Sequence, residues 1–462
     1  MVTRQIRTSL SSQDLFLLFK DHAHCFFLDS GMDHGKLGRF SLIGFDPFVR
    51  FSSKNGQVRI EGGGLDQDCP GNPFHALQDL LRHFKSDYSG PLPFVGGAVG
   101  YLAYDLCHHI EVLPRTAIDD IGIPDCFFGI YDGAIILDHL KDEVTLASPG
   151  LAGDPENWVN EVEKLIVAGQ GAGSAPLPTA DCKSSSLRSN FTRAAYLEAV
   201  NRVKDYIEAG DIYQANLTQR FSGRINCPSP ELYCRLRQVN PAPFACYLDF
   251  GDGQILSSSP ERFIQVRSRK VQTRPIKGTR PRRADPAADL ASLRELLASE
   301  KDRAELLMIV DLVRNDLGRV SKTGSVKVTE LFHPETYATV HHLVATVEGE
   351  LDDGYDTIDC LKAAFPGGSI TGAPKIRAME IIDELEPTQR NIYTGSVGYI
   401  GLNGDADFNI VIRTILKQND RVCFQVGGGI VWDSDAEQEY LETRQKGKAL
   451  MQALGSPDET EV

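Results

Sequence analysis

Hydrophobic and polar positions alternate in short runs along the first 168 residues. The runs CFFLDS, RFSLIGFDPFVRF, DGAIILD and EVTLAS are separated by Gly, Asp and Pro. Alternation places apolar side chains on one face of a strand, and the separating residues favour turns. The pattern therefore predicts that residues 1–168 form a β-rich portion of the fold.

Helical periodicity appears in the segment FTRAAYLEAVNRVKDYIEAG, which ends at Gly210. Its apolar residues recur at intervals of three and four, and glycine commonly terminates helices. This apolar stripe consists of Tyr196, Val200, Val203 and Ile207. The segment is therefore predicted to be an amphipathic helix.

The rest of the chain mixes predicted helices and strands. One helix is predicted to open with Ser229 as its cap before Pro230, since proline is favoured in the first helical turn. Longer helices are predicted over about 286–317 and 434–454. The runs QILSSS, YTGSVGYIGL, NIVIRTILK and RVCFQVGGGIVW are predicted strands.

Residues 169–190, GQGAGSAPLPTADCKSSSLRSN, are small, polar and interrupted by proline. This composition is typical of an exposed loop. We expect the loop to separate the β-rich portion, 1–168, from a second portion, 191–462, without requiring two independent domains.

Composition narrows the function classes. A chain of 462 residues with 42% hydrophobic content can build a large core, and its net charge of -15 argues against nucleic-acid or anionic-membrane partners. No apolar run approaches the roughly 20 residues of a spanning helix. The ten cysteines include no C-x-x-C pair, so we expect reduced thiols and a cytoplasmic protein.

Candidate chemistry is ambiguous when each motif is taken alone. Glu439 and Glu442 share one helix face, which suits either a hard cation or a solvated face with a Glu442 to Lys446 ion pair. The glycines of 367–372 and 426–430 suit either ligand contact or structural turns and bulges.

The joint arrangement of motifs is more specific. In order along the chain stand PIKGT, KDRAELLMIVDLVRNDLGRV, FPGGSITGAPK, GSVGYIG, NIVIRT, GGGIVWDSD and EYLETRQKGKA, preceded by GRFSLIGFDP and FVGGAVGYLAYDL. Over nearly its whole length the chain resembles the chorismate-utilising enzymes, and most closely their aminodeoxychorismate branch. The resemblance implies one large α/β (α+β) domain with two antiparallel β-sheets and surrounding helices.

The resemblance also implies the site residues. Mg²⁺ would be held by Glu305, Glu439 and Glu442 and would separate these carboxylates from the dianionic chorismate. Arg413, which we expect within the NIVIRT strand, would bind the enolpyruvyl carboxylate beside Tyr393. The remaining substrate contacts implied are Gly278, Thr279, His342, Thr371, Gly427, Gly428, Gly429 and Lys446.

Two positions distinguish branches of the family. Gln214 stands where isochorismate and salicylate enzymes carry a water-activating lysine, and Lys277 stands where anthranilate synthases carry alanine. The resemblance implies that Lys277 attacks ring carbon C2 while Glu261 protonates the departing C4 hydroxyl. We expect neighbouring cations such as Arg274 and Arg280 to lower the pKa of Lys277.

The implied reaction converts chorismate and ammonia to 4-amino-4-deoxychorismate for 4-aminobenzoate and folate synthesis. A separate glutamine amidotransferase subunit would supply the ammonia, because 462 residues leave no room for a fused glutaminase. The alternatives are anthranilate synthase component I and a catalytically inactive chorismate-binding regulator. The family also implies a tryptophan site, for which CFFLDSG and the NPAPF segment around Pro243 and Phe244 are the expected walls.

Overall fold

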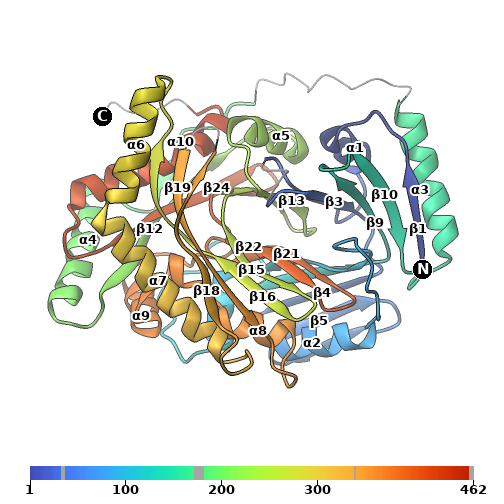
Figure 1. Cartoon of the computed structure of the whole chain (residues 1–462), viewed down its shortest axis with the longest axis horizontal. Helices are drawn as coiled ribbons and strands as arrows, with labels where there is room; N and C mark the ends of the chain where they lie inside the picture. The colour runs from blue at the N-terminus through green and yellow to red at the C-terminus, as the bar shows by residue number, and fades with distance from the viewer. Residues whose placement is uncertain (33–36, 171–181, 338–339, 457–462) are drawn as a thin grey trace.

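Two β-sheets, packed face to face and flanked by helices, form the centre of the computed structural model (Figure 1). The structure describes residues 1–32, 37–170, 182–337 and 340–456. Each sheet has twelve strands, and all pairs of neighbouring strands are antiparallel. The two antiparallel sheets and surrounding helices that the family resemblance implies are confirmed.

The first sheet follows, in order across it, β1 (Val2–Ile6), β10 (Glu143–Ser148), β9 (Ala134–Asp138), β3 (Phe40–Gly44), β2 (Phe26–Asp29), β13 (Phe244–Asp249), β14 (Gln254–Ser259), β23 (Thr414–Gln418), β24 (Arg421–Ile430), β12 (Gln214–Arg224) and β11 (Arg188–Ser189), with β20 (Gly372–Ala373) also paired to β12. The second sheet follows β17 (Ile276–Pro281), β19 (Val340–Glu350), β16 (Lys270–Arg274), β15 (Arg262–Arg267), β22 (Ala406–Asn409), β21 (Ser396–Gly401), β7 (Gly97–Leu102), β8 (Cys126–Tyr131), β4 (Val49–Lys54), β5 (Gln57–Gly62) and β6 (Gln67–Pro70), with β18 (Lys327–Thr336) also paired to β19.

The helices are α1 (Ser12–Phe19), α2 (Pro73–His83), α3 (Pro155–Gln170), α4 (Arg193–Glu208), α5 (Ser229–Val239), α6 (Pro286–Ala298), α7 (Glu300–Gly318), α8 (Thr357–Ala364), α9 (Lys375–Leu385) and α10 (Ala436–Ala453), with short 3₁₀ helices η1 (Tyr104–His109) and η2 (Gly368–Ile370). Among the described residues, no helix combines the length and apolar character needed to cross a membrane.

Three large apolar clusters explain the layering. The middle cluster joins residues of both sheets, including Phe26 of β2 and Tyr101 of β7, so it lies between the sheets. A second cluster packs α1, α3, α5 and α10 on the other face of the first sheet. A third packs α2, α7 and α8 on the other face of the second sheet. Burial of apolar side chains on both faces of the sheets stabilises a helix, sheet, sheet, helix arrangement.

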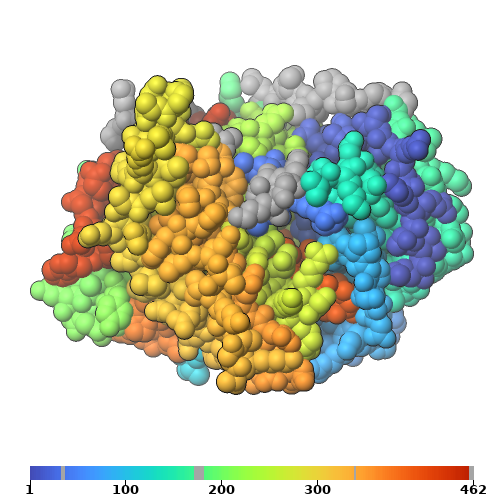
Figure 2. All heavy atoms as spheres, viewed as in Figure 1, coloured from blue at the N-terminus to red at the C-terminus, as the bar shows by residue number. Residues whose placement is uncertain are grey.

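The predicted β-rich portion and the rest of the chain share both sheets. β2 of the first portion pairs with β13 of the second, and β7 pairs with β21 in the same way. On the face of the molecule shown in Figure 2, α6, α7 and β18 (yellow to orange) lie on the left, and residues of the first portion (blue to blue-green) lie on the right. The two portions therefore depend on each other for their hydrogen bonding.

Several helix predictions are confirmed and two are corrected. α4 buries Tyr196, Val200 and Val203 and is followed by Gly210 at a φ of +81°, as the periodicity predicts. The helix predicted over 286–317 is two helices, because Ser299 adopts extended backbone and its side chain caps α7. Ser229 does not cap α5, since Pro228 occupies the cap position and the Ser229 hydroxyl donates to the Gln254 side-chain oxygen at 2.8 Å.

The predicted loop over 169–190 and the cysteine prediction both need correction. Residues 171–181 lie outside the described residues, but Gln170 still belongs to α3 and residues 188–189 form β11. Cys182 is buried and forms a disulfide with Cys227 across a Cα–Cα distance of 5.3 Å. This pair is therefore not reduced as expected, and a pairing of cysteines 45 residues apart depends on tertiary contacts that no local motif records.

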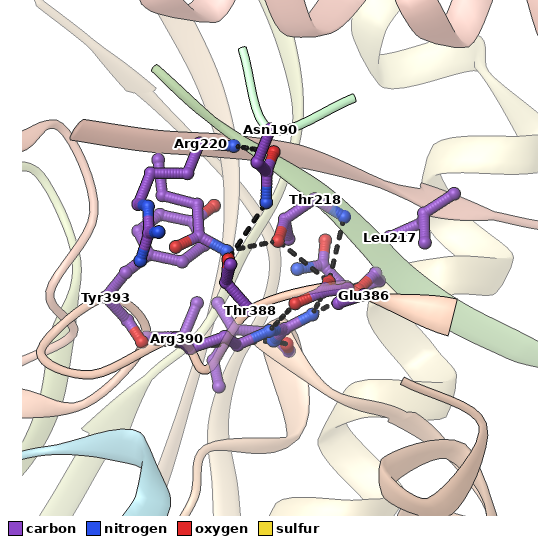
Figure 3. Close-up of polar contacts among 12 residues, drawn as sticks. Asn190, Leu217, Thr218, Arg220, Glu386, Thr388, Arg390 and Tyr393 are labelled. Carbon is purple, nitrogen blue, oxygen red and sulfur yellow. Dashed lines mark hydrogen bonds and ion pairs between the residues drawn. The ribbon is translucent and has the colours of Figure 1, made fainter. Parts of the chain in front are cut away.

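A buried ion pair joins three elements close to one end of the first sheet (Figure 3). Glu386, just after α9, accepts two hydrogen bonds from the Arg390 guanidinium at 2.7 and 2.9 Å and two more from the backbone and hydroxyl of Thr218 on β12. Arg390 also donates to the carbonyls of Ile370 in η2 and Asn216 on β12. Both charged side chains are almost fully buried, at 1% and 2% exposed. Such a pair is stable only while every charge keeps its partner.

Replacement of Arg390 by methionine is expected to lower the free energy of unfolding by about 3–5 kcal/mol, because Glu386 is left as an unpaired buried carboxylate. Adding Glu386→Gln to that variant should restore part of the loss. Urea unfolding followed by circular dichroism measures both effects. Arg224→Met, which removes the exposed partner of Asp420, is the matched control and should cost about 1 kcal/mol or less. Equal losses for Arg390→Met and Arg224→Met would contradict the assigned role of the buried pair.

Candidate active site

Lys277 lies at an interruption of the β17–β19 ladder. Lys277 pairs with Leu343 and Thr279 with His342, so Gly278 is an extra residue on β17. Gly278 has a φ of +75°, a conformation that side chains other than glycine rarely adopt. Bulges of this kind redirect neighbouring side chains, and here the Lys277 amine reaches the carbonyl of Ser369 at 3.2 Å.

Burial changes the acid–base behaviour of Lys277. The largest effect on its pKa is loss of hydration, which lowers the value because a charged ammonium is disfavoured away from water. The Glu305 carboxylate opposes this shift, while the positive charge of Lys446 adds to it. The predicted effect of Arg274 and Arg280 is not found. Their guanidinium groups are held by acidic partners, Glu330 and Glu335 for Arg274 and Glu295 and Asp302 for Arg280.

Glu261 lies just before β15 and is 5% exposed. Burial raises its pKa to about 7, although a hydrogen bond from the Ser369 hydroxyl at 2.7 Å and the positive charge of Lys277 act in the opposite direction. A carboxyl group with this pKa holds its proton in part of the molecules near neutral pH, as a general acid requires.

Ser369 therefore contacts both residues predicted to perform the chemistry, and the sequence prediction missed it. It lies in η2, after Gly367 and Gly368, within the motif PGGSITGAPK. The signal available was a hydroxyl residue in a glycine-rich turn, but such residues are common in turns that bind nothing.

The three predicted metal ligands come from two helices. α7 supplies Glu305, and α10 supplies Glu439 and Glu442. A methyl group placed on Gly428 of β24 would lie 2.9 Å from Glu439 Oε2 and 3.6 Å from Glu442 Oε1, so both carboxylates lie over this glycine. Burial raises the pKa of Glu305 and of Glu439, and the negative charge of Glu442 contributes to both increases. The three carboxylates are therefore electrostatic neighbours.

The carboxylates do not converge fully. Glu442 forms an ion pair with Lys446 at 2.6 Å, and Glu439 accepts a hydrogen bond from Ser434 at 2.6 Å. Burial pushes the pKa of Glu442 upward, but the charge and hydrogen bond of Lys446, together with the charges of Lys301 and Lys277, lower the pKa overall. Within the described ranges, the one cluster with all its ligand atoms within 4.8 Å of each other is Cys182, Cys227 and Glu231, whose sulfurs are already bonded to each other. Magnesium binding by Glu305, Glu439 and Glu442 stays a prediction.

Arg413 lies between β22 and β23, which corrects its placement within a strand. Its φ of +53° interrupts the extended backbone that NIVIRT suggests, and its guanidinium donates to the Lys446 carbonyl. Burial lowers the pKa of Arg413, while the nearby Tyr393 and Glu442 oppose that shift. Tyr393 is thus beside Arg413, as predicted, and burial raises the pKa of its hydroxyl.

The remaining predicted contacts surround these groups. His342 Nδ1 and the Thr279 hydroxyl are 2.9 Å apart, and burial followed by the charge of Arg413 lowers the pKa of His342 to about 4, so its ring is neutral at pH 7. Thr371 is fully buried and its hydroxyl donates to the Gly367 carbonyl at 3.0 Å. That bond stabilises the turn, and a substrate contact by Thr371 stays a prediction.

Gly427, Gly428 and Gly429 lie on β24 opposite β12. Lys446 donates to the Gly427 carbonyl at 2.9 Å, and a methyl group on Gly429 would collide with the Gln214 amide nitrogen at 1.9 Å. Gln214 is buried, and its side-chain oxygen has no hydrogen-bond partner among the described residues. The glycines therefore allow α10 and Gln214 to approach the strand closely.

A separate cavity of about 510 Å³ lies between the sheets. Its walls include Tyr399 of β21. They also include Leu28 and Asp29 of β2, Pro243 and Phe244, which lie in the two segments where the tryptophan site was expected. Neither Lys277 nor Glu261 lines it. Its occupation by tryptophan stays a prediction.

Known proteins resemble the chain along most of its length. The model of the chorismate binding enzyme family matches residues 23–452. Aminodeoxychorismate synthase component 1 of Salmonella typhimurium is 43% identical over 92% of both chains, and that of Bacillus subtilis is 39% identical over 93% of both. Anthranilate synthase component 1 of Acetivibrio thermocellus is 38% identical over 98% of this chain and 94% of its own.

Solved structures agree with this relationship. Anthranilate synthase component I of Streptococcus pneumoniae superposes with a TM-score of 0.80 at 35% identity, covering 89% of this chain and 91% of that one. MenF, the menaquinone-specific isochorismate synthase of Escherichia coli, shares the fold with a TM-score of 0.73 at 18% identity, covering 98% and 94%. Because the match in sequence and in structure spans nearly the whole chain and includes the elements that carry the site, the chain belongs to the chorismate binding enzymes.

Proposed function

We propose that this protein is component 1 of an aminodeoxychorismate synthase, which converts chorismate and ammonia to 4-amino-4-deoxychorismate for 4-aminobenzoate and folate synthesis. Relatives with that name are 39–43% identical over more than nine tenths of the chain. The observation that carries the proposal is the largely buried amine of Lys277, joined to the carboxyl of Glu261 through Ser369.

The first step is a displacement at the substrate ring. The neutral Lys277 amine forms a bond to C2, both conjugated ring double bonds shift by one position, and the C4–O bond breaks. Glu261 gives its proton to the departing oxygen, which leaves as water, and the new secondary ammonium on Lys277 loses a proton to the Glu261 carboxylate. Lowering the pKa of the lysine and raising that of the glutamate both favour the reactive forms near pH 7.

The second step reverses the shift. The nitrogen of ammonia bonds to C4, both double bonds return to their original positions, and the C2–N bond to Lys277 breaks. Lys277 leaves as an amine and takes up one proton from the incoming nitrogen. The sum of both steps exchanges the C4 hydroxyl for an amino group and releases one water.

A magnesium ion fits the cluster of Glu305, Glu439 and Glu442. The negative charge of Glu442 raises the pKa of the other two carboxyl groups, so a cation is needed between this cluster and an anionic substrate. When bound, Mg²⁺ would neutralise charge where the ring carboxylate of chorismate enters. Arg413 and Tyr393 would bind the second carboxylate of the substrate.

We propose that ammonia comes from a glutamine amidotransferase subunit in the cytoplasm, since the name component 1 of the relatives implies a second component.

Anthranilate synthase component 1 is the second candidate. Proteins with that name are up to 40% identical over more than nine tenths of the chain. Lys277 argues against it, because alanine at this position would let ammonia reach C2 directly. A catalytically inactive regulator is disfavoured by the presence of every residue that the two steps require. The product of chorismate, Mg²⁺ and ammonia separates the three: aminodeoxychorismate, anthranilate or nothing.

Without ammonia, chorismate is expected to leave an adduct on the peptide that contains PIKGT, seen as added mass on the intact protein. Lys277→Ala should abolish the adduct and replace C4 amination with slow C2 amination, since Glu261 and the metal ligands remain. Lys270→Ala, on the exposed end of β16, is the matched control and should keep the adduct. Wild-type rates of aminodeoxychorismate formation in Lys277→Ala would refute the covalent step.

Glu442→Gln is expected to weaken Mg²⁺ binding about tenfold or more, because one of three charged ligands is lost. Titration calorimetry with Mg²⁺ measures binding directly, and activity at limiting Mg²⁺ should fall in parallel. Glu437→Gln, five residues earlier in α10 and paired with Arg193 at the surface, serves as control. Unchanged Mg²⁺ affinity in Glu442→Gln would show that the metal assignment is wrong.

The purified chain is expected to use ammonium salts at high pH but not glutamine. Adding a glutamine amidotransferase subunit should make glutamine a nitrogen source, which is measured as chorismate consumption with glutamine alone. Glutamine-driven turnover by this chain without a partner would contradict the predicted partnership.

A further inference from the structure

Ser369 presents two polar groups to two different residues of the site. Its hydroxyl donates to Glu261 Oε1 at 2.7 Å, and its carbonyl accepts from Lys277 Nζ at 3.2 Å. Glu261 and Lys277 come from different segments of the chain, the entry to β15 and the bulge on β17. One residue therefore fixes the relative placement of the proposed acid and the proposed nucleophile.

We propose that Ser369 is a positioning residue, whose hydroxyl holds the carboxyl group of Glu261 and whose carbonyl aims the amine of Lys277 at the substrate. The inference rests on the proposed function for the roles of these two partners. It extends that function to a residue outside the predicted site.

The hydroxyl controls how readily Glu261 gives up its proton. A donor to a carboxylate stabilises the charged form, which is the form that remains after the proton has left. The Ser369 bond accordingly opposes the increase in the pKa of Glu261 that burial causes, together with the charge of Lys277 and the backbone N–H of Ile276 on β17. Two other charged groups line the small cavity beside Glu261, but each is engaged elsewhere. Arg262 pairs with Asp407, and Asp316 of α7 pairs with Lys375.

The carbonyl controls where the lysine lone pair points. A neutral amine has two N–H groups and one lone pair, and only the lone pair can attack carbon. A carbonyl oxygen accepts hydrogen bonds and cannot donate a proton, so it binds one N–H and leaves the lone pair directed away from itself. The 3.2 Å contact thus orients Lys277 without protonating it.

The turn that carries Ser369 is fixed by buried bonds on both sides. Arg390 Nη1 donates to the carbonyl of Ile370, the next residue, at 2.9 Å. Thr371 is bonded through its hydroxyl to Gly367 and through its carbonyl to the backbone of Asn216 on β12. The buried pair of Arg390 and Glu386 (Figure 3) therefore supports the position of Ser369 through one intervening residue.

A graded set of substitutions tests the proposal: Ser369→Thr keeps the hydroxyl, Ser369→Cys replaces it with a weaker donor, and Ser369→Ala removes it. The rate of chorismate consumption is measured against pH at a fixed concentration of free ammonia, and melting temperatures confirm folding. Ser229→Ala, which removes a hydroxyl on α5 that is bonded to Gln254 on β14, is the matched control and should leave the pH profile unchanged.

The direction of the expected change in the pH profile follows from the role of Glu261. Glu261 must be protonated to act, so the rate falls as pH rises through its pKa, which gives the basic limb of the profile. Loss of the Ser369 donor raises that pKa, and the basic limb in Ser369→Ala should move about one pH unit higher. The maximal rate should fall about tenfold, because a weaker acid transfers its proton less readily and the Glu261 carboxyl is less well held. Ser369→Cys should lie between Ser369→Ala and the wild type, and Ser369→Thr close to the wild type.

An unchanged basic limb in a folded Ser369→Ala protein would overturn the proposal, and so would a limb that moves equally in Ser369→Thr and Ser369→Ala. The readout is chorismate consumption, and the leaving C4 hydroxyl needs a proton whichever amino product forms. Product identification is a separate measurement. If wild-type protein makes anthranilate, the proposed function fails while the test of the Ser369–Glu261 bond still gives its answer.

Discussion

Loss of hydration around charged side chains is the constraint on which the site depends. Burial lowers the pKa of Lys277 and Arg413 and raises that of Glu261, and each shift favours the uncharged form of the side chain. A charged group in such surroundings persists only with partners, and a neutral one becomes reactive. The protein shows both outcomes: Arg390 and Glu386 form a buried ion pair, whereas burial lowers the pKa of the Lys277 amine and raises that of the Glu261 carboxyl.

Two strands of the second sheet and one turn hold the proposed acid and the proposed nucleophile. β17 carries the lysine at a bulge, β15 begins just after the glutamate, and η2 supplies the serine that contacts both. α7 contributes Glu305 near its start and Asp316 near its end, where Asp316 pairs with Lys375 at the start of α9. A single helix therefore links the acidic cluster of the site to the element that follows the serine turn.

The sequence predicts most of the architecture and part of the site. Alternation and periodicity identify strands such as β4 and β10 and helices such as α4, because those patterns record which face is buried. Motif resemblance supplied the residues around Lys277. The local pattern did not reveal the break at Ser299, since serine is tolerated within helices and its role as a cap depends on the packing of the next helix.

Other features depend on contacts distant in sequence, which no local pattern records. Arg274 and Arg280 were expected to lower the pKa of Lys277, but acidic residues from β18, α6 and α7 form ion pairs with them. The bond between Cys182 and Cys227, the left-handed backbone at Arg413 and the double role of Ser369 arise in the same way.

Strand order has a further consequence for how the chain reaches this state during synthesis. In the first sheet β23 and β24 are inserted between β14 and β12, and in the second sheet β21 and β22 are inserted between β7 and β15. Until residues 396–430 have left the ribosome, both sheets remain divided, with open edges on four strands that are interior in the finished molecule. The N-terminal portion therefore cannot complete a sheet during synthesis before the C-terminal portion has been made. A nascent chain stalled before β21 would expose unpaired strand edges, which chaperones must shield from other chains.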